Sequence, residues 1–417
     1  MLAVAPDYLP QAWVEGHLVG NSSREDKLRI SQIECIPVTS NFKKPFPMGG
    51  GVEKGSAGVV IKMHTDEGIV GIADTGGTSA WYRGETQDSI MGMINNVFGP
   101  SILLGEDPFN IEKIVARMDY AARDNNQAKA VVDYALHDIV GKALGVPVYK
   151  LLGGLTTEKI PLGFVMPAER TEEVVAIGMK AVRAGFGVLK LKVGYGKEED
   201  DIENVRALRE AVGEDIQIFI DANGSWNYYQ ALMILKKLEK YDLAMVEQPV
   251  PWWDVDGMAR LRNKIGIPVF ADESATELKH LLEIAQKNAA DGFFIKIPKA
   301  GGLLKSQKWV SIAKAAGLPV VCGCMMGSGI EAATYTHLLV SDEWMSKLVH
   351  ENIGPLHIHD VFDTVSQPIK NDLAVNVPRY ENGFLYPTHG PGIGIELNDD
   401  VLSQLSTPGK SPTVIYK

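Results

Sequence analysis

Five short peptides, spaced almost evenly along the second half of this 417-residue chain, constrain its fold most. Each ends a short apolar run with residues that can bind metal or move a proton. The intervals from Lys192 to Asp221, Glu247, Asp272 and Lys296, taken in turn, are 29, 26, 25 and 24 residues. One strand plus one helix takes about this length, so the series predicts a parallel β/α barrel with its charged residues at the C-terminal mouth. The peptides are Leu189-Lys190-Leu191-Lys192, Asp221-Ala222-Asn223, Glu247-Gln248-Pro249, Ala271-Asp272-Glu273-Ser274 and Ile295-Lys296-Ile297-Pro298.

The barrel is predicted to have eight strands but only seven helices. Amphipathic stretches such as 172–184, 203–212, 228–240 and 303–316 separate the apolar segments, but this rhythm does not resume after Pro355. We therefore expect a modified (β/α)7β TIM-type barrel over residues 156–385. The predicted strands are residues 160–164, 188–193, 218–221, 244–247, 269–272, 293–297, 320–324 and 348–353.

The part before the barrel has a different pattern. A predicted hairpin around the turn Asp66-Glu67-Gly68 is followed by helical periodicity from residue 88 to about residue 145. Strands followed by a block of helices predict an α+β capping domain over residues 29–155. Residues 1–28 are predicted to be an N-terminal extension, and residues 386–417 a C-terminal segment that packs back on the capping domain.

Composition excludes several classes of protein. The net charge of −11, without any Lys/Arg-rich run, argues against nucleic-acid binding. Residues 1–20 have neither a basic start nor a continuous apolar run, so we expect no signal peptide and no membrane span. The three cysteines (Cys35, Cys322 and Cys324) are too few for a disulfide framework, which favours a cytoplasmic protein. No nucleotide-binding glycine motif is present.

The lysines of the first and fifth peptides are candidate acid/base groups. Period-two geometry places Lys190 and Lys192 on one face of their strand, and helices cover the outer face of a parallel barrel. Both ammonium groups should therefore point into the barrel, where they need carboxylates nearby. Lys296 lies within an apolar run and is expected to do the same, whereas Lys299 follows the strand end and is expected to face solvent.

The acidic residues predict a metal site. Asp221, Glu247 and Asp272 could each cap the next helix, but their recurrence at three successive strand ends favours one shared ion. Carboxylate oxygens suit Mg²⁺, for which Mn²⁺ could substitute, whereas zinc would need histidine or cysteine. Beside them, Asn223 and Glu273 are candidate substrate-binding or supporting residues. For Glu351, substrate-binding and structural roles are equally open, and His357 and His359 are expected to be surface or packing residues.

Together these motifs resemble the enolase superfamily, and within it the muconate lactonizing enzyme (muconate cycloisomerase) subgroup, over about residues 29–405. The resemblance implies Mg²⁺ held by the three carboxylates, Lys192 and Lys296 as an acid/base pair, and Lys190 lowering the pKa of Lys192. The mandelate racemase subgroup is disfavoured because residues 320–324 contain no histidine. One departure is the segment Met325-Met326-Gly327, where the subgroup usually has Met-Leu-Glu.

The chemistry expected is removal of the proton α to a carboxylate, giving an enediolate stabilised by the metal. The similarity of residues 351–356 to muconate cycloisomerases favours a cycloisomerase acting on a small carboxylate. Three alternatives stay open: a racemase or epimerase of an amino-acid derivative (proline, N-acyl or N-methyl amino acids included), a dehydratase of a hydroxy acid, and a non-catalytic binding barrel. Residues 46–51 and 78–82 of the capping domain are expected to select the substrate. Their apolar character, together with Trp252 and Trp253, suggests a substrate with an unsaturated or cyclic apolar part, and we expect a homo-oligomer.

Overall fold

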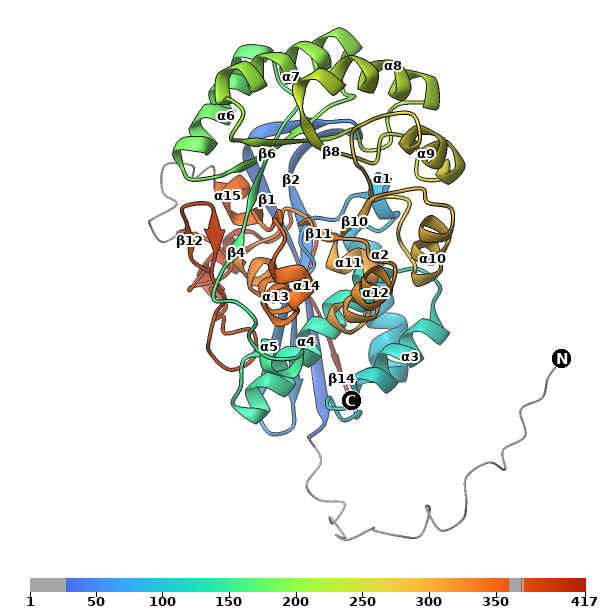
Figure 1. Cartoon of the computed structure of the whole chain (residues 1–417). Helices are drawn as coiled ribbons and strands as arrows, with labels where there is room; N and C mark the ends of the chain where they lie inside the picture. The colour runs from blue at the N-terminus through green and yellow to red at the C-terminus, as the bar shows by residue number, and fades with distance from the viewer. Residues whose placement is uncertain (1–27, 360–368, 370) are drawn as a thin grey trace, which may run out of the picture.

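The computed structural model describes residues 28–359, 369 and 371–417 of the chain, and the expectations for residues 1–27 lie outside this part (Figure 1). A capping domain built on an antiparallel sheet lies against a barrel of parallel strands surrounded by helices. The predicted fold class is confirmed.

The capping sheet has the strand order β14-β1-β2-β3. Its long hairpin, β1 (Ile30–Met48) and β2 (Gly51–Thr65), turns at Gly49-Gly50 and reaches the mouth of the barrel. A Cβ atom on Gly49 would lie 2.3 Å from the carbonyl oxygen of Ala222, so only glycine allows this approach. The sheet is completed by β3 (Val70–Asp74) and by the C-terminal β14 (Thr413–Tyr416), which pairs with β1.

Helix α4 (Asn126–Leu144) joins the capping domain to the rest of the molecule and is buried over most of its length. Its Asp138 accepts hydrogen bonds from the backbone of Ile72 on β3 and of Ile393 near the C-terminus, both at 2.9 Å. The other capping helices are α1 (Ala80–Arg83), α2 (Gln87–Met93), the π-helix η2 (Ile94–Leu103), α3 (Ile111–Ala121) and α5 (Val148–Leu151).

The barrel sheet contains seven parallel strands in the described part of the chain, in sequence order from β5 to β11. They are β5 (Gly163–Met166), β6 (Val188–Lys192), β7 (Gln217–Asp221), β8 (Leu243–Glu247), β9 (Val269–Ala271), β10 (Gly292–Ile295) and β11 (Val320–Cys322). The helices that follow them are α6 (Thr171–Arg183), α7 (Glu198–Val212), α8 (Tyr228–Leu238) with the 3₁₀ turn η3 (Glu239–Tyr241), α9 (Val255–Arg262), α10 (Leu278–Gln286), α12 (Leu303–Ala315) and α13 (Gly329–Ser341).

The remaining described elements are short. They are β4 (Ile160–Pro161), β12 (Tyr380–Glu381) and β13 (Phe384–Leu385), which form a small sheet, and the helices α11 (Ile297–Ala300), α14 (Glu343–Ser346), α15 (Gly354–His359) and α16 (Asp399–Gln404).

Three predicted strands need correction. The first, residues 160–164, is divided: β4 pairs antiparallel with β13 in the small sheet, and the barrel strand β5 covers Gly163–Met166. The eighth, residues 348–353, is not a strand: His350 forms one isolated bridge with Leu162, and Glu351 donates a 2.8 Å backbone hydrogen bond to Cys322. Gly354-Pro355 starts α15 directly afterwards, so the segment closes the barrel without extending into a ladder. The predicted strand 293–297 ends at Ile295, because Pro298 lies in the first turn of the short helix α11.

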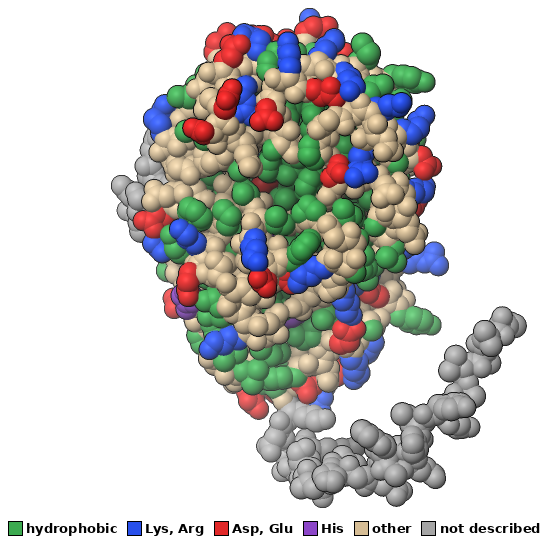
Figure 2. All heavy atoms as spheres, viewed as in Figure 1, with side chains coloured by type: hydrophobic (Ala, Val, Ile, Leu, Met, Phe, Trp, Pro, Cys, Tyr) green, Lys and Arg blue, Asp and Glu red, His purple; other side chains and the backbone are tan. Residues whose placement is uncertain are grey.

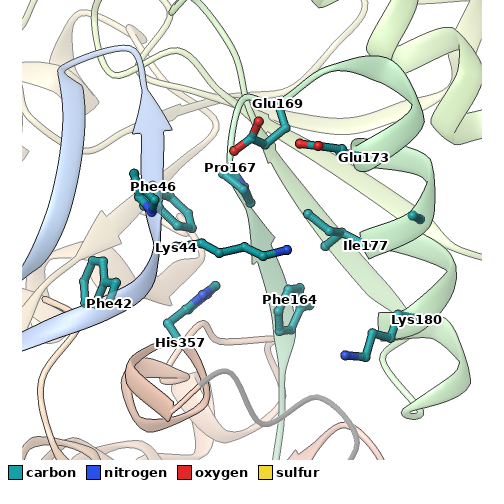
Figure 3. A pocket seen from close by; sticks show the side chains of 12 residues that line it. Phe42, Lys44, Phe46, Phe164, Pro167, Glu169, Glu173, Ile177, Lys180 and His357 are labelled. Atoms are coloured by element: carbon teal, nitrogen blue, oxygen red, sulfur yellow. The ribbon is translucent and has the colours of Figure 1, made fainter.

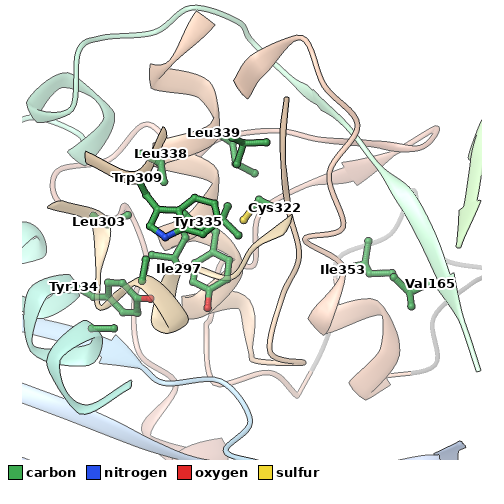
Figure 4. Close-up of a cluster of buried hydrophobic side chains, with 14 of the residues drawn as sticks. Tyr134, Val165, Ile297, Leu303, Trp309, Cys322, Tyr335, Leu338, Leu339 and Ile353 are labelled. Carbon is green, nitrogen blue, oxygen red and sulfur yellow. The ribbon is translucent and has the colours of Figure 1, made fainter. Parts of the chain in front are cut away.

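Two layers of buried side chains hold the barrel. The interior contains one side chain each from six strands, namely Val188, Phe219, Met245, Phe270, Phe294 and Val321. The outer layer packs helices against strands, and Figure 4 shows Trp309 of α12 and Tyr335 of α13 around β11. The visible surface carries interspersed charges of both signs (Figure 2). Among the described residues, no helix is long and apolar enough to cross a membrane.

Candidate active site

Strand register brings the site residues together at one end of the barrel. Lys192 lies beside Asp221, and Asp221 beside Glu247, because these residues are partners in parallel ladders. Asp272 and Lys296 come immediately after β9 and β10. The carboxyl ends of five successive strands therefore supply all five residues to one rim.

Ion pairs connect the lysines to the carboxylates across this rim. Lys192 Nζ lies 2.6 Å from Asp221 Oδ2, and Lys296 Nζ lies 2.6 Å from Asp272 Oδ2. Lys190 Nζ lies 2.6 Å from Glu247 Oε2 and also contacts the carboxylate of Glu351. The carboxylates of Asp221, Glu247 and Asp272 are fully buried, and that of Glu351 is nearly so. Because Glu351 also contacts Lys190, it lies inside the charged cluster.

Lys299 was expected to face solvent, and this prediction is wrong. Its side chain is 1% exposed and its ammonium group lies 2.5 Å from Asp272 Oδ1. It also donates hydrogen bonds to the backbone oxygens of Asp272 and Phe294, at 2.7 and 2.8 Å. The one-turn helix α11 turns the chain back toward the rim, which places Lys299 under Asp272.

Asn223 and Glu273 extend the network on the side of Lys192. Asn223 accepts a 3.0 Å hydrogen bond from Lys192 and donates one of 2.9 Å to Glu273. Its backbone has a left-handed φ of 47°, stabilised by a 2.9 Å hydrogen bond from its own amide to Asp221 Oδ1. Asn223 thereby orients Lys192 and Asp221 together.

Sequence reasoning missed two residues that position Asp272. Tyr82, from α1 of the capping domain, donates a 2.8 Å hydrogen bond to Asp272 Oδ1, and the ammonium group of Lys296 lies 4.2 Å from its ring centre. Gln248 accepts hydrogen bonds from the amides of Asp272 and Ser274, at 3.0 and 3.1 Å. Gln248 lies beside Glu247 in the third peptide and Tyr82 lies in the segment 78–82 expected to select the substrate, but the sequence did not predict that either residue contacts Asp272 or its backbone.

Burial and charge shift the pKa values of these groups. Burial lowers the pKa of Lys190 and Lys296, but nearby carboxylates, chiefly Glu247 for Lys190 and Asp272 for Lys296, outweigh it and raise both above the ordinary value. Burial raises the pKa of Glu273 to about 7, with Asp272 and Asp221 adding to the effect. Burial and the Asp221 carboxylate likewise raise the pKa of Glu247. The carboxylates of Asp221, Glu247, Asp272 and Glu273 therefore lie close enough together to disfavour one another's ionisation.

The donor set fits a hard cation, although the carboxylates are paired with lysines. Among the described residues, no group of three His, Cys, Asp or Glu side chains is arranged to hold a metal. Oxygens of Glu247, Glu273 and Glu351 are nevertheless buried without a hydrogen-bond partner. A buried carboxylate oxygen that lacks a donor is costly. Of these three residues Glu247 belongs to the strand-end carboxylates, and a divalent ion held there would satisfy its free oxygen.

Five residues of this site, Lys190, Lys192, Asn223, Lys296 and Glu351, line a cavity of about 100 Å³ between the rim and the capping domain. Phe46, Met48, Thr78, Trp81 and Tyr82 line its capping side, and these lie in the two segments expected to select the substrate. Trp252 and Trp253 do not line this cavity and are 65% and 67% exposed. The two tryptophans therefore say nothing about the substrate.

The loop after β11 also lines the cavity, through Met325 and Met326. Gly327 donates a 2.7 Å hydrogen bond to Glu331, and a Cβ atom at position 327 would lie 2.5 Å from the same carboxylate oxygen. Burial raises the pKa of Glu331 to about 8. The Glu331 carboxylate, from α13, thus occupies the space beside Gly327. Position 327 is where the muconate lactonizing enzyme subgroup usually has a glutamate.

A second cavity, of about 320 Å³, lies beside the first (Figure 3). Phe42 and Phe46 line both cavities. The ring of His357 packs against Phe46 and Phe164, with centroids 5.2 Å apart in each case. His359 lies 3.0 Å from Asp372.

Comparison with known proteins identifies the family. Residues 32–153 match the mandelate racemase / muconate lactonizing enzyme N-terminal domain, and residues 173–401 match the enolase C-terminal domain-like model. An N-succinyl-L-Arg/Lys racemase from Bacillus cereus is 32% identical over 91% of this chain and 98% of its own. A chloromuconate cycloisomerase from Cupriavidus necator is 29% identical over 89% of this chain and 98% of its own.

Solved structures agree with these matches. A mandelate racemase/muconate lactonizing family protein from Azoarcus sp. EbN1 is 54% identical, with a TM-score of 0.87, and covers 93% of this chain and 100% of its own. A dipeptide epimerase from Enterococcus faecalis, complexed with Mg and a dipeptide, is 28% identical with a TM-score of 0.81, covering 88% and 99%. The chain therefore belongs to the mandelate racemase / muconate lactonizing enzyme family of the enolase superfamily, and it is an enzyme of the isomerase class.

Proposed function

We propose that this enzyme removes the proton α to a carboxylate and returns a proton from the opposite face, as a racemase or epimerase of an N-substituted amino acid. The supporting observation is that Lys192 and Lys296 line one cavity, each paired at 2.6 Å with a different carboxylate of the rim. A racemase needs an acid/base group for each stereoisomer, and this arrangement offers two equivalent groups.

In this proposal Asp221, Glu247 and Asp272 hold one Mg²⁺, for which Mn²⁺ can substitute. When bound, the ion would stabilise the charge that develops on the substrate carboxylate and offset the carboxylates that raise the pKa of Lys296. Lys192 Nζ takes the α-proton from one isomer and Lys296 Nζ from the other. Lys190, held by Glu247 and Glu351, keeps positive charge next to Lys192.

The capping wall of the cavity favours a substrate with one carboxylate. Among the described residues that line it, the cations are Lys190, Lys192 and Lys296, all on the barrel side. The opposite wall carries Glu53, which accepts hydrogen bonds from Ser79 and Trp81 at 2.8 and 3.1 Å. A second carboxylate, such as that of muconate, would meet this negative charge without a partner.

A cycloisomerase acting on a muconate-type substrate, the reaction favoured by the sequence, is the second candidate. Glu351 supports it, because the segment that resembles muconate cycloisomerases places this residue against Lys190. In that reaction one lysine moves the proton and the other stabilises charge.

Proton exchange distinguishes the two reactions. We expect both enantiomers of N-acetyl amino acids to exchange their α-proton in D₂O, measured by NMR, and to lose optical rotation. EDTA should abolish both activities and Mg²⁺ or Mn²⁺ should restore them. Consumption of cis,cis-muconate without exchange of any amino-acid derivative would favour the cycloisomerase instead. Full activity after metal removal would contradict the metal site.

We further propose that the enzyme is cytoplasmic and forms a homo-oligomer. The three cysteines are free, which suits a reducing compartment. Light scattering of the purified protein measures the oligomeric state, and a monomer at micromolar concentration would contradict this part of the proposal.

A further inference from the structure

The reaction cavity is small for the substrate class proposed above. Its volume is about 100 Å³, whereas pockets for small-molecule ligands typically have volumes of ~300–1,000 Å³. The amino-acid carboxylate and α-carbon must lie near the lysines at its floor. An N-substituent therefore needs further space, and the neighbouring cavity of about 320 Å³ provides it.

This neighbouring cavity, here called the side cavity, lies between β1, β5, α6 and α15. Figure 3 shows Phe42 and Phe46 on one side, Phe164 and Ile177 on the other, and the side chain of Lys44 extending between them. Phe42 and Phe46 form the boundary between the two cavities, since they line both. A substituent that passes these rings leaves the reaction cavity and enters the side cavity.

The walls of the side cavity are mainly apolar. The apolar lining comprises Phe42, Pro45, Phe46, Phe164, Pro167 and Ile177. Removing an apolar group from water against these walls favours binding, and the gain grows with the apolar area buried. Rings on several sides also suit flat groups, because aromatic pairs pack edge to face.

Charges at the side cavity compensate one another. Glu169 and Glu173 lie side by side where α6 begins, and the positive charge of Lys44 acts on both carboxylates. A second lysine, Lys180, also contributes to the lining. With two cations and two carboxylates, the lining does not select a charged ligand.

We propose that the side cavity is a distal subsite that binds an uncharged, apolar N-acyl group of the substrate, of the size of a hexanoyl or phenylacetyl group. The proposal rests on the proposed racemase function. It assigns to Ala176 and Ile177 of α6 a place in substrate selection, together with the capping-domain residues Phe42 and Phe46.

Filling the side cavity from α6 tests this assignment. Ala176 is exposed and lines the cavity, so Ala176→Trp adds volume there without disturbing the rim or the core. Glu172→Trp, exposed on the same helix but outside the lining, is the matched control. Both variants and the unaltered enzyme are assayed with N-acetyl, N-hexanoyl and N-phenylacetyl forms of one amino acid, and binding is measured by calorimetry.

We expect kcat/KM of the unaltered enzyme to be at least tenfold higher for the hexanoyl and phenylacetyl substrates than for the acetyl substrate. Ala176→Trp should remove this advantage and leave the acetyl substrate within twofold, whereas Glu172→Trp should change neither. Racemisation that is independent of acyl size would overturn the subsite but leave the proposed function standing. Tighter binding of longer acyl groups without turnover, lost in Ala176→Trp, would overturn the function but support the subsite.

Discussion

At the scale of single residues, Lys192 and Lys296 occupy matching positions. Each is a nearly buried lysine, paired at 2.6 Å with an aspartate from the next or the preceding strand unit. Each also has a second neighbour: Asn223, from the same peptide as Asp221, for Lys192, and the ring of Tyr82, from the capping domain, for Lys296. Each lysine is therefore held by two neighbours, which suits a group that must meet the substrate carbon in one orientation.

Replacing each lysine separates the two reactions. Lys192→Ala and Lys296→Ala should each lower racemisation by about 10²–10⁴-fold. Each variant should still exchange the α-proton of one enantiomer, and the two variants should retain opposite enantiomers, as followed by NMR in D₂O. Lys197→Ala, exposed just beyond β6, is the control and should retain full activity. Wild-type rates in either site variant would disprove the assignment.

Lys299 should matter for stability. Lys299→Met leaves the Phe294 oxygen without this donor and removes one partner of the buried Asp272 carboxylate, at a cost of about 3–5 kcal/mol in the free energy of unfolding. Lys314→Met removes a partly exposed ion pair with Asp342 and should cost less than about 1 kcal/mol. Denaturant unfolding measures both values. Equal stability of the two variants would contradict the structural role of Lys299.

The sequence predicted the residues that end strands but not those brought in by other elements. Lys190, Lys192, Asp221 and Glu247 follow from strand period and spacing alone. Lys299 was misplaced because the one-turn helix α11 has no periodicity to detect. Tyr82 lies in a segment expected to select the substrate, but its contact with Asp272 could not be predicted, since it lies 190 residues earlier in another domain.

At the scale of elements, the loop between β6 and α7 depends on a buried carboxylate. Asp201 is 4% exposed, accepts a 2.8 Å hydrogen bond from the Gly194 amide, and lies in the first turn of α7. Burial raises its pKa from 3.8 to about 6. Since the folded state binds this proton more tightly than the unfolded chain, the associated stability is present below pH 4 and is lost as the pH rises through 6.

Asp201→Asn should remove this pH dependence. The amide oxygen can still accept the Gly194 hydrogen bond but carries no charge to desolvate. Relative to wild type, the variant should gain up to about 3 kcal/mol between pH 4 and 7, because one pKa unit corresponds to ~1.4 kcal/mol. Thermal unfolding across this range provides the measurement. A constant difference between variant and wild type at every pH would refute the explanation.

Elements with a strong repeat were predicted well, and those at the ends of the repeat were not. Helices α8 and α12 begin at the predicted residues, because apolar periodicity marks their buried faces. The eighth barrel segment has a similar apolar pattern but forms only the His350 bridge, since Gly354-Pro355 immediately starts α15. An apolar sequence pattern shows that a segment is buried, but the adjoining residues of the chain determine how many of its residues pair with another strand.

At the scale of the whole molecule, buried histidines join the barrel to the chain around it. His337 of α13 accepts a 3.3 Å hydrogen bond from the Tyr149 amide of α5, and its other nitrogen lies 3.3 Å from Thr388 Oγ1. Burial lowers the pKa of His337 to about 4, and that of His350, beside β11, also to about 4. Both side chains are neutral in the folded enzyme.

These histidines predict loss of stability in mild acid. The unfolded chain takes up their protons near pH 6.5, whereas the folded enzyme does so only near pH 4. Their contribution is thus present above pH 6.5 and is lost as the pH falls through 4. His337→Gln should be less stable than wild type at pH 7 but should lose less on acidification, as measured by thermal unfolding. An unchanged pH profile would contradict this account.

The junction between β5 and β11 has few hydrogen bonds, and this determines where the barrel opens locally. Beside β5 and β11 the ring is completed by a few backbone hydrogen bonds of His350 and Glu351, whereas every other junction is a parallel ladder. Local opening begins where the fewest bonds must break. Among the strand junctions of the barrel, the amide protons at His350 and Glu351 should therefore exchange with solvent first. Glu351 also contacts Lys190. Local opening at this junction would expose the charged cluster to solvent before any other strand junction of the barrel opens.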